Sequence, residues 1–149
     1  MTTGGYSVSL NIDGPRDPQY VLELAEAFSG CVRVLNHLTR DHGALQYPSE
    51  ADRLVREVAL AVSRLPQLLG QAGAWLEAER AAGRILVPSG TFAGDPDLAV
   101  VTARLRLDEA AAYLAEAERA LSAAAAVTAG LAAAETGEEH DSSEENGIE

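Results

Sequence analysis

The chain has no lysine, few aromatic residues and one cysteine among its 149 residues. All eleven basic residues are arginines, and they face 23 acids, giving a formal net charge of −12. That balance argues against direct nucleic-acid binding, which depends on neutralising phosphates. A lone cysteine cannot form an intramolecular disulfide, and it makes a reducing, cytoplasmic compartment the default. No apolar run approaches the roughly 18 residues of a membrane span, and no secretory leader is evident. Neither a membrane-spanning segment nor secretion is therefore expected.

An alanine-rich stretch from about Asp97 to Ala134 carries an apolar repeat with alternating steps of three and four. Such a repeat places one narrow stripe along a single long helix, which we predict over 96–134 with Pro96 in its first turn. The stripe consists of Val100, Ala103, Leu107, Ala110, Leu114, Ala117, Leu121, Ala124, Thr128 and Leu131.

A first helix is predicted over 17–42, with Asp17 as its N-cap and Gly43 as its C-terminal stop. Its stripe is Val21, Leu24, Phe28, Cys31, Leu35 and Leu38, in which Cys31 is expected to be a small core residue.

A second helix is predicted over 49–82, opened by Ser49 and Asp52 and kinked but continuous at Pro66. Its apolar face is Leu54, Val58, Ala61, Leu65, Leu68, Ala72 and Trp75. A neighbouring row of Val55, Val62, Leu69 and Leu76 widens this face. A face of this width can pack against two neighbouring helices rather than one, so this row is a candidate partner-binding surface.

These segments predict an all-α fold, an up-down-up antiparallel three-helix bundle over 17–134 with short connections. The alternative is half of a larger bundle that a second copy completes.

An extended arm over 1–16 precedes the bundle. Tyr6, Val8, Leu10 and Ile12 alternate with polar residues, as in a strand, and are a second candidate partner-binding surface. The arm either lies on the bundle or pairs with a second subunit or another protein.

Residues 135–149 hold seven acids, no arginine and one aliphatic side chain, which predicts a disordered acidic tail. The tail serves either solubility or attraction of a basic partner.

Chemistry-bearing patterns are sparse. His37 and Asp41 are four residues apart and share a helix face, but His42 points elsewhere, so this weak polar cluster is expected to be a solvated pair rather than a metal site. No catalytic, cofactor-binding or metal-binding residue is assigned, and the protein is not expected to be an enzyme.

The stretches RVLNHLTRDHGA and YPSEADRLVREVALAVSRLPQLL resemble small helical proteins of actinobacterial phages and integrated mobile elements. The resemblance covers residues 6–134 and implies a small accessory protein without a catalytic motif.

The sequence favours a non-enzymatic, self-associating protein-interaction or regulatory protein, with a homodimer as the expected state. The alternative is an acidic regulator that engages a nucleic-acid-binding protein by mimicking phosphate charge.

Overall fold

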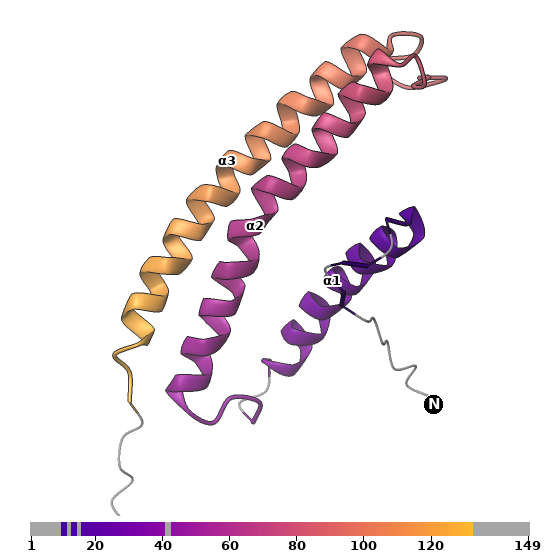
Figure 1. The fold of residues 1–149 in the computed structure, drawn as a ribbon. Coiled ribbons are helices and arrows are strands. Elements are labelled where there is room, and N and C mark those ends of the chain that lie inside the picture. The colour runs from indigo at the N-terminus through magenta and orange to yellow at the C-terminus, as the bar shows by residue number, and fades with distance from the viewer. Residues whose placement is uncertain (1–9, 12, 15, 41–42, 133–149) are drawn as a thin grey trace, which may run out of the picture. The chain divides into compact units, whose positions relative to one another are not determined.

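The computed structural model describes residues 10–11, 13–14, 16–40 and 43–132 (Figure 1). The chain divides into two units, Met1–Gln46 and Tyr47–Glu149. All regular structure in the described residues is helical, with α1 over Pro18–Leu38, α2 over Pro48–Ala81 and α3 over Pro96–Thr128. The predicted all-α class is therefore confirmed. The acidic tail predicted over 135–149 lies outside the described residues.

In the first unit, α1 begins as its sequence predicts. The Asp17 carboxylate accepts a hydrogen bond from the Gln19 N–H at 3.1 Å, and Pro18 occupies the first helical position. The helix ends at Leu38 rather than His42, with Thr39 as its C-cap. The Thr39 hydroxyl donates to the Leu35 carbonyl at 2.8 Å in the last turn.

No residue of α1 is buried, and Cys31 is exposed, so the expectation of a core cysteine is wrong. Leu24 is half-buried, whereas Val21, Phe28, Leu35 and Leu38 are exposed. The first unit by itself thus leaves most of the helix's apolar stripe open to solvent.

Before α1, hydrogen bonds of Asp13 and Gly14 to Asn11 form a turn. The Asp13 N–H donates to the Asn11 side chain at 3.0 Å, and the Gly14 N–H donates to the Asn11 carbonyl at 3.1 Å. The Asn11 N–H in turn donates to the Tyr20 hydroxyl. Leu10 is exposed, and the other members of the predicted arm, Tyr6, Val8 and Ile12, lie outside the described residues.

In the second unit, α2 begins one residue earlier than predicted and uses a different cap. Tyr47 is the N-cap, Pro48 takes the first helical position, and the Glu50 carboxylate accepts the Tyr47 N–H at 3.1 Å. The proposed cap at Ser49 and Asp52 is therefore wrong, and Asp52 is left for a different contact.

The second helix runs through Pro66 as one element of 34 residues. Pro66 lacks the N–H that would bond the Val62 carbonyl, a loss that costs about 3 kcal/mol in a helix interior. Because α2 packs against α3 on both sides of Pro66, tertiary contacts support the helix across the missing bond.

A loop over 82–95 joins α2 to α3. Gly83, Gly90 and Gly94 adopt positive φ there, which other residues rarely tolerate, and the loop contains no strand. The Asp95 carboxylate then accepts the Leu98 N–H at 2.9 Å and caps α3. The third helix ends at Thr128, two residues before Gly130, rather than near residue 134.

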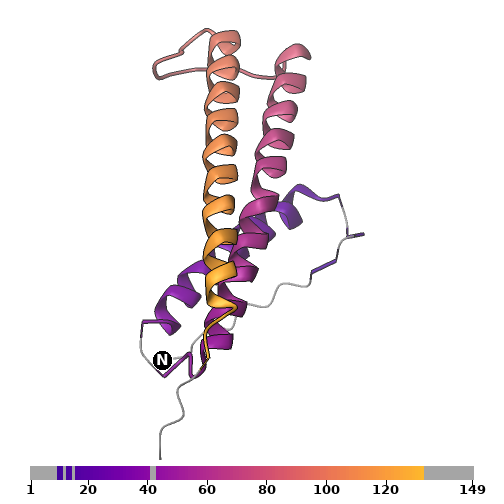
Figure 2. The ribbon, with the colours of Figure 1, turned by 90° about the vertical axis from the view of Figure 1, so that its left-hand side faces the viewer.

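The helices α2 and α3 lie side by side and antiparallel, forming a helical hairpin (Figures 1 and 2). Their inner faces follow a regular three-four repeat of buried and half-buried residues. In α2 these are Asp52, Val55, Ala59, Val62, Pro66, Leu69, Gly73, Leu76 and Arg80, and in α3 they are Val100, Arg104, Leu107, Ala111, Leu114, Glu118, Leu121, Ala125 and Thr128. We call these two rows the seam.

The seam differs from the predicted stripes in its phase. On α3, Val100, Leu107, Leu114, Leu121 and Thr128 belong to it as predicted. The residues one step after the predicted alanines, at 104, 111, 118 and 125, complete the seam, while Ala103 and Ala110 are half-buried at its border and Ala117 and Ala124 are exposed. The seam therefore includes Arg104 and Glu118. A pattern of apolar residues does not identify them, because each has a charged end although its aliphatic part can pack between helices.

On α2 the predicted neighbouring row, from Val55 to Leu76, enters the seam. The predicted main face is divided, because Leu54, Ala61 and Leu65 are half-buried whereas Val58, Leu68, Ala72 and Trp75 are exposed.

Candidate interaction surface

The hairpin has two long edges that flank the seam, and polar contacts between the helices identify one of them. The Arg56 guanidinium donates to the Ala125 carbonyl at 3.5 Å, and Arg104 lies 3.4 Å from the Glu77 carboxylate. Residues seven apart stack in one column, so positions 56, 63, 70 and 77 of α2 and positions 104, 111, 118 and 125 of α3 border this edge. We call it the polar edge.

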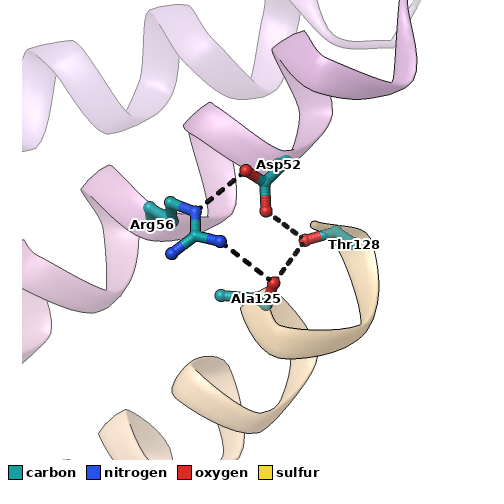
Figure 3. A network of polar contacts seen from close by, with 4 residues as sticks. All are labelled: Asp52, Arg56, Ala125 and Thr128. Carbon is teal, nitrogen blue, oxygen red and sulfur yellow. Dashed lines mark hydrogen bonds and ion pairs between the residues drawn. The ribbon is translucent and has the colours of Figure 1, made fainter. Parts of the chain in front are cut away.

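A four-residue network closes the polar edge near the open end of the hairpin (Figure 3). The Asp52 carboxylate binds Arg56 Nε at 2.8 Å through one oxygen and accepts the Thr128 hydroxyl at 2.7 Å through the other. Arg56 reaches on to the Ala125 carbonyl. The start of α2 is thus bonded to the last turn of α3, which fixes the register of the hairpin.

Ionisation of Asp52 is coupled to this network. Hydrogen bonding by Arg56, and then by Thr128, lowers the pKa of Asp52 below its ordinary value of 3.8. A second such pair lies beside the loop, where two hydrogen bonds of 2.6 Å from the Arg84 guanidinium lower the pKa of Glu79. The Asp52–Arg56 pair therefore links the start of α2 to the end of α3, and the Glu79–Arg84 pair links the end of α2 to the loop that follows it.

A shallow groove of about 420 Å³ follows the network along the polar edge. Its polar groups already bind one another or the backbone, since Ser122 donates to Glu118 at 2.6 Å and Ser63 donates to the Leu60 carbonyl. The groove is lined by Arg56, Ala59, Leu60, Ser63, Glu118, Ser122, Ala125 and Ala126.

The opposite edge is apolar. On α2 it consists of the column Val55, Val62, Leu69 and Leu76, followed around the helix by Val58, Leu65 and Ala72. On α3 it consists of the alanines at 103, 110, 117 and 124, followed by Tyr113, Ala120 and Val127. These columns contain two charged residues, each in an ion pair: Glu79, which ends the Val58 column and binds Arg84 at 2.6 Å, and Arg106, which binds Glu109 at 2.7 Å. We call this surface the apolar edge.

The predicted partner-binding row therefore has a divided role. Val55, Val62, Leu69 and Leu76 are half-buried because their inner sides contact α3, and their outer sides border the apolar edge. The sequence pattern misses the alanine column of α3 as an outward surface. No apolar periodicity signals it, because the choice between the two alanine columns depends on Gly73 leaving room for Arg104 across the seam.

The predicted polar cluster is only partly described. His37 is exposed in the last turn of α1, where its carbonyl accepts the Arg40 N–H at 3.4 Å, and Asp41 lies outside the described residues. Within the described part of the chain, no group of three histidine, cysteine or acidic side chains could hold a metal ion. No helix there is long and apolar enough to cross a bilayer.

No protein-family model, curated protein or solved structure matches this chain. The resemblance to helical proteins of phages and mobile elements therefore stays a prediction, and the candidate surface depends on geometry alone.

Proposed function

We propose that this chain is a non-enzymatic protein-interaction protein, which binds helices of a protein partner along the apolar edge of the α2–α3 hairpin. A cytoplasmic location and an accessory or regulatory role are part of the same proposal. The observation that carries it is the contrast across one helix. The side of α2 facing the polar edge is hydrogen-bonded to α3, whereas the side facing the apolar edge is lined by half-buried valine and leucine side chains and by Val58, which is 37% exposed.

Burial in the hairpin supports this proposal. Among the described residues, only Ala59, Gly73, Val100 and Ala125 are buried, although the two helices together contain 67 residues. A helix is held mainly by the packing of its apolar face. Because the seam covers only one flank of each helix, a further helical layer on the apolar edge would supply the missing burial.

Site-specific photo-crosslinking in the full chain tests the proposal. A photoreactive phenylalanine analogue replaces Val58, which is 37% exposed on the apolar edge, or Leu60, which is 46% exposed on the polar edge. We expect the probe at position 58 to form covalent adducts with a polypeptide in the host cell, and the probe at position 60 to form few. Absence of adducts at position 58, or equal yields at both positions, would contradict the proposed function.

A further inference from the structure

We propose that the partner on the apolar edge is a second copy of this chain, related by a two-fold axis parallel to the hairpin, so that two hairpins form a four-helix bundle. This inference rests on the proposed interaction function and names its partner. It is carried by the shape of the apolar edge, by the levels of its residues and by its lack of unpaired charge.

The apolar edge is self-complementary in shape. Its α2 side is a ridge of large side chains, among them Val58, Leu65 and Leu69. On its α3 side the alanines at 103, 110, 117 and 124 form a trough, whose outer border carries the larger side chains of Tyr113 and Val127. A two-fold axis along the hairpin places the ridge of each copy over the trough of the other, so the same contact is made twice. An axis across the hairpin would instead place ridge against ridge.

The levels of residues along the hairpin suit this arrangement. Asp52 contacts Thr128, Arg56 contacts Ala125 and Glu77 contacts Arg104, so residues whose numbers sum to about 180 lie at the same height. A copy rotated about the long axis keeps these heights, and Val58 of one copy then lies level with Ala120 of the other. Each helix has only antiparallel neighbours, as in an up-down four-helix bundle.

The charge on this edge also permits a second copy. Stacking two identical surfaces is unfavourable where each carries unpaired charge of one sign. The two charged side chains in the columns of the apolar edge already have ion-pair partners within the same unit, Glu79 with Arg84 and Arg106 with Glu109. The apolar edge is continuous with the seam, so the dimer core would extend the packing that already holds α2 to α3.

Sedimentation of the full chain tests the inference with a matched pair of variants. Ala117 and Ala115 are both exposed on α3 and two residues apart, but Ala117 lies in the trough and Ala115 on the side of the polar edge. We expect the wild-type chain to sediment at twice the mass of one chain. Ala117→Phe fills the trough and should weaken the dimer roughly tenfold or more, whereas Ala115→Phe should leave it unchanged.

Three results would overturn the inference: a monomer at every concentration, a dimer that both phenylalanine variants weaken equally, or a dimer that neither weakens. A monomeric chain whose position 58 still crosslinks to a different protein would overturn the second copy as partner but support the proposed function. Crosslinks from position 58 to another part of the same monomer would overturn both. Circular dichroism of each variant checks that helix content is unchanged.

Discussion

The two edges of the α2–α3 hairpin are built from the same two helices, yet they differ in almost every physical property. The polar edge carries directional contacts, such as Asp52 to Thr128 and Glu77 to Arg104, which fix the register and orientation of α3 against α2. The apolar edge carries valine, leucine and alanine without a directional contact between the helices. Polar contacts specify one arrangement but add little net stability at an exposed site, whereas apolar area drives association. The contacts that specify the fold of the hairpin thus lie on a different edge from the surface that we propose for a partner.

The largest effect should come from placing a charge on each edge in turn. Val58→Glu puts a carboxylate on the apolar edge, where the proposed second copy would cover it, and Leu60→Glu puts one beside the polar groove. We expect Val58→Glu to weaken self-association by roughly 30-fold or more, because burying an unpaired charge costs several kcal/mol, and Leu60→Glu to have little effect. Size-exclusion chromatography with light scattering measures both. Equal loss in the two variants would remove the distinction between the edges.

Truncation of a seam residue should have the next largest effect. Leu69 is half-buried against α3, so Leu69→Ala should lower the free energy of unfolding by about 2 kcal/mol. Leu60 is exposed, so Leu60→Ala should change it by less than about 0.5 kcal/mol. Urea unfolding followed by circular dichroism measures both values. A smaller loss for Leu69→Ala than for Leu60→Ala would show that the seam is misplaced.

Two glycines of α2 provide a more sensitive test of the seam. Gly70 has open space where a Cβ would lie, so Gly70→Ala should stabilise the helix by roughly 1 kcal/mol. A Cβ at Gly73 would lie 2.7 Å from Cδ of Arg104, so Gly73→Ala must displace that side chain and should lose the gain or reverse it. Thermal unfolding of the two variants measures the difference. Equal stabilisation would contradict the close approach of Arg104.

The smallest effect concerns acid stability at the polar edge. The pKa of Asp52 is lower in the folded chain than its ordinary value of 3.8, so its ionised form stabilises the fold above about pH 4, and this stabilisation is lost as the pH falls through the folded pKa. Asp52→Asn should therefore flatten the dependence of unfolding free energy on pH between about pH 5 and pH 2. Glu57→Gln, an exposed change on the same helix, should leave that slope as it is in the wild type. An unchanged slope in Asp52→Asn would show that the network does not couple to folding.

The helices themselves could be predicted from the sequence because their signals are local. Asp17 with Pro18 and Asp95 with Pro96 are direct capping signals, and the structure uses both. The start of α2 was misplaced because Ser49 is an attractive cap, whereas the Tyr47 cap depends on Glu50 reaching back to a backbone N–H.

The phase of the seam could not be predicted in the same way. On α3, alanines lie on both sides of the leucine column, so the sequence does not show which side faces the neighbouring helix. The side that packs inward depends on the shape of α2. The structure resolves it through pairs that are distant in sequence, namely Gly73 with Arg104 and Asp52 with Thr128. Neither arginine nor aspartate counts as a core residue in an apolar pattern, so the polar edge, and with it the outward position of the alanines, was out of reach.

Disulfide crosslinking between two differently substituted chains tests the central claim most directly. In a Cys31→Ser background, a chain with Val58→Cys is mixed with one carrying Ala120→Cys, two apolar-edge positions that lie level in the proposed dimer. A parallel mixture carries Leu60→Cys and Ser122→Cys, which line the polar groove at the matching height. Rapid formation of a covalent dimer in the first mixture and not in the second is the predicted result. Absence of a covalent dimer from the first mixture, or its equal formation in both, would contradict a second copy on the apolar edge.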